Sequence, residues 1–199
     1  MKKVKHIIIP IDRKVIDNSF DIMESQIGLQ ERTGRNDGPH IEDYHALYHL
    51  RYKSKGKNYP YCQMAQGYWL YKANGDSWEG IEFMKTAGTM RAVRWALKQG
   101  KLSDNELPIK KHDLLYWKKP GTAYGHVERA YNDFDGLSGR TIGANTSNGL
   151  KGSQREGDGI FERYRDFSKP IGSLHPYAII HFDLTETPVT PFKNEHRVV

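Results

Sequence analysis

The sequence has little cysteine and no long hydrophobic run. Its 199 residues include a single cysteine, Cys62, which excludes an internal disulfide and any metal site built from four cysteines. The longest unbroken apolar runs are four residues, for example Leu114–Trp117, whereas a transmembrane helix needs about 20. Repeats and low-complexity linkers are absent as well. These absences indicate a single-core protein with one thiol and no membrane span.

Positive charge is in modest excess. The 30 Lys and Arg residues outnumber the 24 Asp and Glu residues, which gives a net charge of +6 and a pI near 9.2. Such a field favours contact with polyanions, whether nucleic acid, acidic polymers of a cell envelope or anionic lipid. The basic residues are scattered, however, and the 7 Phe, 4 Trp and 12 Tyr form no recognisable nucleic-acid-binding module. We therefore expect no nucleic-acid partner.

The chain divides into a helical front half and a strand-rich back half. Hydrophobic spacing predicts helices over residues 20–31, 41–51, 62–72 and 90–98. Short strands separated by Gly-, Pro- and Asp-containing turns are predicted over residues 113–117, 124–131, 140–145, 160–165 and 177–183. Helices followed by a run of strands indicate an α+β domain with a mainly antiparallel sheet.

Both ends of the chain are expected to lie outside the domain. Residues 1–19 are interpreted as an N-terminal extension and residues 185–199 as a C-terminal tail, around a domain at 20–184. The start is basic, but Pro10 and Asp12 break the apolar stretch and no small-residue cleavage site follows. We therefore expect no standard signal peptide.

Cys62 is the most informative residue for chemistry. It follows an extended Pro-Tyr segment and opens a predicted helix. A helix N-terminus directs backbone N–H groups and the positive end of the dipole at the sulfur, which favours the thiolate. A thiolate attacks amide carbonyls when a histidine assists it. The alternative is a buried cysteine that acts as a small hydrophobic residue.

His126 and Asn145 are the candidate partners of this thiol. His126 lies on a predicted strand after Gly125, whose backbone is free to approach a neighbour closely. Asn145 ends the next predicted strand, where it could orient the imidazole by accepting from one ring N–H. The alternatives are a strand histidine without a task and a simple turn at residues 145–149.

An ordered set of short motifs surrounds these residues. They read E-R-T-G-R-N-D-G-P at 31–39, P-Y-C at 60–62, H-D-L-L at 112–115, G-H-V at 125–127, G-A-N-T at 143–146 and R-E-G-D-G at 155–159. In this order the set resembles the cysteine, histidine-dependent amidohydrolase/peptidase (CHAP) superfamily, close to the NlpC-type cell-wall hydrolases. Two positions depart from the family pattern. Tyr61 stands where tryptophan is common, and Gly143 stands where many relatives have a glutamate that orients the histidine. Asn145 is then the one matched orienting residue.

The resemblance implies a papain-like fold, with the helical half packed on a sheet of five to six strands. It also implies hydrolysis of a peptidoglycan amide bond, by an N-acetylmuramoyl-L-alanine amidase or a peptidoglycan endopeptidase. Cys62 would be the nucleophile, His126 the base and Asn145 the orienting residue, without cofactor or metal. The partner would be the stem peptide or cross-bridge, and the bond cleaved stays open.

Two further interpretations compete with this one. His45 and His49 are four residues apart on a predicted helix, a spacing used in zinc sites, but no glutamate follows His45 and no third ligand is apparent. A solvated helix face explains the pair better. A protein can also keep the hydrolase fold without its activity and serve as a wall-binding or virion component.

Without a signal peptide, a cell-wall hydrolase has to be delivered by other means. We expect synthesis in the cytoplasm and delivery by lysis, in a virion or by a secretion device, as for a phage lytic protein or an injected antibacterial effector. Such a protein can have an immunity or virion partner.

Overall fold

The computed structural model describes residues 3–53, 55–147 and 157–185. The helices in this part of the chain are α1 (Arg13–Ser25), α2 (Pro39–Leu47), α3 (Cys62–Ala73), the short 3-10 helix η1 (Glu82–Met84) and α4 (Thr89–Gln99). The strands are β1 (Lys5–Asp12), β2 (Lys101–Ser103), β3 (Leu114–Lys118), β4 (Gly125–Ala130), β5 (Ser138–Thr146), β6 (Gly159–Asp166) and β7 (His175–Thr185).

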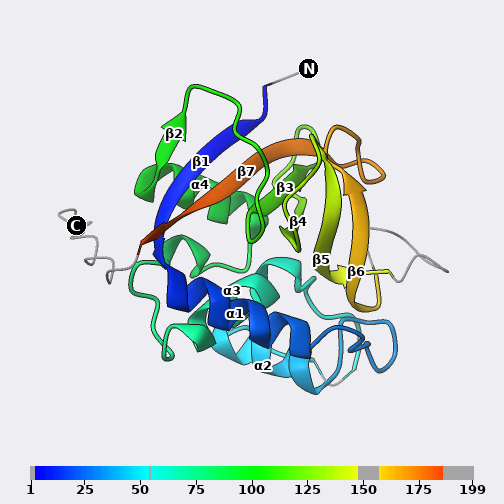
Figure 1. Cartoon of the computed structure of the whole chain (residues 1–199). Coiled ribbons are helices and arrows are strands. Elements are labelled where there is room, and N and C mark those ends of the chain that lie inside the picture. Colours follow the sequence, from blue (N-terminus) through cyan, green and yellow to red (C-terminus); the bar gives the residue numbers. More distant parts are fainter. Residues whose placement is uncertain (1–2, 54, 148–156, 186–199) are drawn as a thin grey trace, which may run out of the picture.

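The strands form one twisted sheet in the order β2-β1-β7-β3-β4-β5-β6 (Figure 1). Only the pairing of β1 with β7 is parallel in the described sheet, and the other neighbours are antiparallel. The α+β class and the mainly antiparallel sheet are therefore confirmed. The described sheet has seven strands instead of five to six, because the sequence analysis did not anticipate β1 and β2.

β1 lies in the segment that was expected to be an N-terminal extension. Its side chains alternate, with Ile7, Ile9 and Ile11 buried in the core. Pro10 is tolerated because β2 pairs only with residues 6–8, so the missing N–H of Pro10 falls beyond that pairing. The sheet thus begins before residue 20. At the other end β7 reaches residue 185, and the rest of the expected tail lies outside the described residues.

α1 begins earlier than predicted. Asp12 is its N-cap and accepts a hydrogen bond from the Lys14 N–H at 2.7 Å. The helix predicted over 20–31 extended across Ile27 and Leu29, and these side chains are 39% and 38% exposed. They follow the helix, which ends at Ser25.

Helices pack around the sheet in two groups. α1, α2 and α3 form a layer at one end of the sheet, and α4 lies behind β1, β7 and β3 (Figure 1). α4 shares one core cluster with β1, β3 and β7, and α1, α2 and α3 share another with β5 and β6. α3 contacts both β4 and β5, so this helix is held against the strands that carry His126 and Asn145. Among the described helices none is long and apolar enough to cross a bilayer.

Candidate active site

Cys62 is the first residue of α3, as predicted. Its side chain is 4% exposed and lies at the wall of a cleft. No side chain caps the N-terminus of α3, so the positive end of the helix is directed at the sulfur without a competing acceptor from a cap. Cys62 therefore combines the start of a helix with a position on the wall of a cleft.

His126 lies on β4 with its ring buried, at 1% exposure. The Cys62 thiol is within hydrogen-bonding reach of this ring, and Nε2 lies 3.1 Å from Oε1 of Glu128. Burial alone would lower the pKa of His126, but the contacts with Cys62 and Glu128 outweigh burial and raise this pKa to about 9. The ring can therefore stay protonated at neutral pH.

Gly125 allows β4 to approach α4 closely, as the sequence suggested. A Cβ at this position would lie 2.6 Å from the Trp117 carbonyl oxygen and 2.8 Å from Oγ1 of Thr89. Neither distance is possible without a shift of the backbone or of the helix. The glycine thus places the N-terminus of α4 directly against the start of β4.

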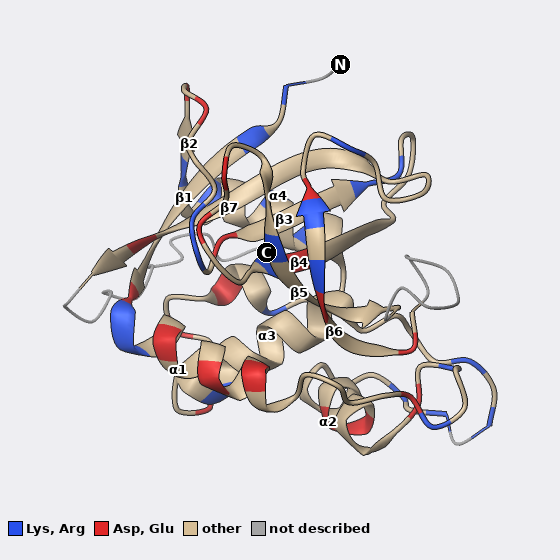
Figure 2. Ribbon diagram, turned by 45° about the vertical axis from the view of Figure 1, so that its right-hand side comes forward, with Lys and Arg blue, Asp and Glu red and all other residues tan. Residues whose placement is uncertain are grey.

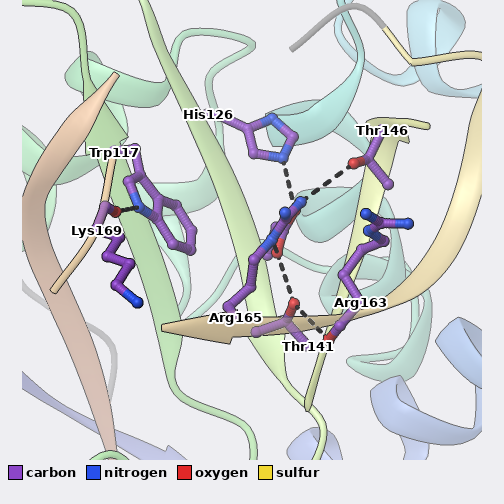
Figure 3. Close-up of polar contacts among 8 residues, drawn as sticks. Trp117, His126, Thr141, Thr146, Arg163, Arg165 and Lys169 are labelled. Carbon is purple, nitrogen blue, oxygen red and sulfur yellow. Dashed lines mark hydrogen bonds and ion pairs between the residues drawn. The ribbon is translucent and has the colours of Figure 1, made fainter. Parts of the chain in front are cut away.

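Glu128 is a buried residue of the site that sequence reasoning missed. It is two residues from His126 on the same strand and therefore on the same face. Its carboxylate accepts from Oγ1 of Thr141 at 2.6 Å, and from Nε and Nη2 of Arg165 at 2.8 and 2.5 Å. Figure 3 shows His126, Thr141 and Arg165 grouped together, with a further contact of Arg165 to Thr146.

These contacts keep the Glu128 carboxylate charged. Burial would raise its pKa, but the Arg165 guanidinium and the His126 ring hold it well below its ordinary value. A charged carboxylate bonded to Nε2 fixes the ring orientation and leaves Nδ1 for the sulfur. Arg165 lies on β6, the strand beyond β5, and in turn compensates the buried negative charge of Glu128.

Gly143 faces Glu128 across the β4–β5 pairing. A Cβ on Gly143 would lie 2.9 Å from both Cγ and Oε1 of Glu128, so a larger residue would displace the carboxylate. Gly143 is the position where the family pattern has a glutamate. In this chain the facing strand supplies the carboxylate instead, and the spacing His126-x-Glu128 on a predicted strand was the signal that could have revealed it.

Asn145 is buried at a bulge of β5, with a φ of 56°. Its backbone amide lies beside the Tyr61 hydroxyl, which places it close to the start of α3. The sequence assigned to Asn145 an orienting contact with one ring N–H of His126, and in the structure Glu128 makes such a contact at Nε2. A direct role for Asn145 in the chemistry stays a prediction.

A cleft of about 790 Å³ opens at Cys62. Its wall includes the starts of both α3 and α4 and the first residue of β4. The residues that line it are Tyr48, Leu50, Tyr59, Pro60, Cys62, Lys85, Thr86, Ala87, Gly88, Thr89, Met90, Arg91, Arg94, Ala123, Tyr124 and Gly125. A smaller cavity of about 250 Å³ lies against β1 and α1, away from the thiol, and its lining contains no nucleophilic side chain paired with a histidine.

The alternative zinc pair is not held on one helix face. α2 ends at Leu47, and His49 lies beyond it with a φ of 52°. His45 is buried, and its Nδ1 lies 2.8 Å from the Ile41 carbonyl oxygen. Within the described ranges, no group of three or more His, Cys, Asp or Glu residues is arranged to hold a metal ion.

Comparisons with known proteins give no assignment. No protein-family model matches the chain, and no curated protein or solved structure matches it. Any statement on activity therefore rests on the motifs and on the geometry of Cys62, His126 and Glu128.

Proposed function

We propose that this protein is a thiol-dependent amide hydrolase with a papain-like core. The observation that carries the proposal is the meeting of Cys62, at the start of a helix, with a buried His126 whose far nitrogen is bonded to Glu128. This arrangement of nucleophile, base and orienting group is the one that amide hydrolysis by a thiol requires. The cleft gives a substrate access to the sulfur.

Within this class, we propose peptidoglycan as the substrate. The support is the ordered motif set at residues 31–39, 60–62, 112–115, 125–127 and 143–146, which resembles the CHAP and NlpC-type cell-wall hydrolases. The reaction would be that of an N-acetylmuramoyl-L-alanine amidase or a peptidoglycan endopeptidase. A phage lytic protein or an injected antibacterial effector is the setting that we propose for it.

The first half of the reaction forms a thioester. The Cys62 thiolate attacks the carbonyl carbon of the scissile amide, and the negative charge moves to the carbonyl oxygen. The Cys62 backbone N–H, in the first turn of α3, is placed to donate to that oxygen. His126 then gives its proton to the leaving nitrogen as the carbon–nitrogen bond breaks.

The second half restores the enzyme. His126, now neutral, accepts a proton from water, and the hydroxide attacks the thioester carbon. The carbon–sulfur bond breaks, the acid product leaves and the sulfur is again a thiolate beside an imidazolium. Glu128 takes no proton in this scheme. It holds the ring and stabilises its positive charge through both halves.

Mass spectrometry of soluble fragments released from purified sacculi tests the proposal. We expect the wild type to release new fragments whose exposed amine identifies the bond, and Cys62→Ala to lower the rate by about 10⁴-fold or more. Circular dichroism of Cys62→Ala serves as the folding control. Failure of the wild type on sacculi of several chemotypes would overturn the proposal and favour a wall-binding protein that has kept the fold.

A further inference from the structure

The cleft beside Cys62 has an uneven charge. Three of its lining residues are cations, Lys85, Arg91 and Arg94, and none of the described lining residues is acidic. Acidic residues occur elsewhere, and Figure 2 shows several along α1 and α2. The chain as a whole carries 24 acidic residues against 30 basic ones. A cleft lining whose charged residues are all cations therefore departs from the average composition of the chain.

The cations are grouped on one side of the cleft. Arg91 and Arg94 are three residues apart on α4 and therefore project from neighbouring positions of one helix face. Lys85 follows η1 directly. All three side chains are exposed, so their charged groups can reach a bound molecule.

The start of α4 adds to the positive potential. Gly88 is its N-cap and Thr89 its first residue, and both line the cleft. α4 has 11 residues and no side-chain cap, so its first-turn N–H groups and dipole favour negative charge on the same side as the two arginines. The close approach of Gly125 to Thr89 fixes this helix end at the start of β4, one residue before His126.

Two exposed tyrosines border the same cleft. Tyr59 and Tyr124 are 56% and 66% exposed. Flat aromatic faces at an open cleft suit the apolar parts of a peptide or a sugar ring. Aromatic surface beside cations is the composition expected for a ligand that is partly apolar and carries anionic groups.

Resting on the proposed function, we propose that the cleft selects peptides with free carboxylates near the scissile amide, and that Arg91 and Arg94 determine this specificity. A guanidinium forms paired hydrogen bonds with a carboxylate. A carboxamide at the same place has no charge and cannot form the same pair. Stem peptides with free carboxylates are therefore the substrates, and their amidated forms are poor ones.

Matched peptides test this selectivity. The probes are muramyl tetrapeptides with free carboxylates and the same peptides with those groups converted to carboxamides. We expect the wild type to prefer the free carboxylates by at least about tenfold in kcat/KM, which is 1.4 kcal/mol. The double variant Arg91→Gln/Arg94→Gln should lose this preference, because its kcat/KM on the free carboxylates falls towards that on the carboxamides. Lys98→Gln, on α4 but outside the cleft lining, is the matched control and should behave as the wild type.

The outcomes separate this inference from the proposed function. Equal rates on both peptides, or a preference that survives in the double variant, would overturn the inference while hydrolysis stands. If the wild type cleaves neither peptide, the proposed function fails. Titration calorimetry of both peptides with Cys62→Ala then tests the selectivity of the cleft by binding alone. Tighter binding of the free carboxylates, abolished by the two arginine substitutions, would support the inference. Equal binding would overturn it.

Discussion

Two buried histidine–carboxylate pairs of the described chain have their histidines on strands of the one sheet, and one of these histidines has a thiol within reach. In the first pair, His126 Nε2 lies 3.1 Å from Glu128. In the second, Nδ1 of His181 on β7 lies 2.7 Å from Oδ2 of Asp113. The carboxylates are buried in both pairs and so are the rings. The difference between the pairs lies in what the second nitrogen of each ring meets.

The second nitrogen of His126 has a thiol within reach, whereas that of His181 meets another histidine. His181 Nε2 lies 2.9 Å from Nδ1 of His6, and this Nδ1 also accepts from the Leu107 N–H at 3.2 Å. The second system ties β1, β7 and the segment before β3 together, and none of its residues lines the cleft at Cys62. A buried histidine–carboxylate pair thus becomes a candidate site only with a nucleophile and an opening.

The largest expected effect on activity comes from removing the imidazole ring of His126, with removal of the His181 ring as the comparison. His126→Ala should lower kcat/KM by about 10⁴-fold, because the thiolate loses its counter-ion and the leaving amine its proton donor. His181→Ala should leave kcat/KM of the folded protein within about threefold and cost about 3–5 kcal/mol of stability, because Asp113 loses its buried partner. Thermal unfolding and a fragment-release assay, run well below the melting temperature, measure both. A similar loss of activity in the two variants would erase the distinction between the pairs. His6→Gln serves as the milder variant if His181→Ala does not fold.

Glu128→Gln should change the pH profile of activity. The carboxylate helps to raise the pKa of His126 to about 9, so its loss lowers that pKa. The alkaline fall of kcat/KM, expected near pH 9 in the wild type, should then move to lower pH. The rate at its optimum should fall by at least about tenfold. Glutamine keeps the shape, but Arg165 becomes an uncompensated buried charge, which costs about 3–5 kcal/mol.

A transfer of the carboxylate gives the matched control for Glu128. The double variant Glu128→Ala/Gly143→Glu moves the carboxylate to the facing strand, where the family pattern has it. Because the two positions are paired, we expect part of the activity and of the alkaline limb to return relative to Glu128→Ala. An unchanged alkaline limb in both Glu128→Gln and Glu128→Ala would show that Glu128 is only a structural residue.

The sequence allowed prediction of the pairing of Cys62 with His126 but not of the carboxylate. Cys62 and His126 are marked by local signals, a helix start after Pro-Tyr and a glycine before a strand histidine. The orienting contact depends on which strand carries the carboxylate, which is a property of the β4–β5 register. The motif resemblance directed attention to Gly143 and Asn145, and the spacing of Glu128 from His126 was overlooked.

The fold was predictable to a similar extent. The helix starting at Cys62 and the antiparallel strands after residue 108 follow from hydrophobic patterning. β1 was missed because it contains a proline and its partner β7 is more than 160 residues away in the sequence. Local patterns carry no information on such a pairing.

The smallest expected effect is a difference between the two pairs in how their contribution to stability depends on pH. The pKa of His6 is lowered, first by burial and then by His181, so its stabilising contribution is present above about pH 6.5 and is lost as the pH falls below that value. The pKa of His126 is raised, so its contribution is present below about pH 6.5 and is lost as the pH rises through about 9. Urea unfolding from pH 5 to 10 measures both. His6→Gln should flatten only the acid limb and His126→Gln only the alkaline limb. A flattened alkaline limb in His6→Gln would contradict this assignment.

The rate at which a small electrophile alkylates Cys62 tests the central claim most directly, since the chain has no other thiol. Iodoacetamide at pH 7 with detection by intact mass gives this rate for the wild type, His126→Ala and His181→Ala. The urea-unfolded wild type gives the reference rate for an exposed thiol. If Cys62 and His126 form the reactive pair, the native wild type and His181→Ala react faster than this reference, and His126→Ala does not. Equal rates in the wild type and His126→Ala would contradict the account.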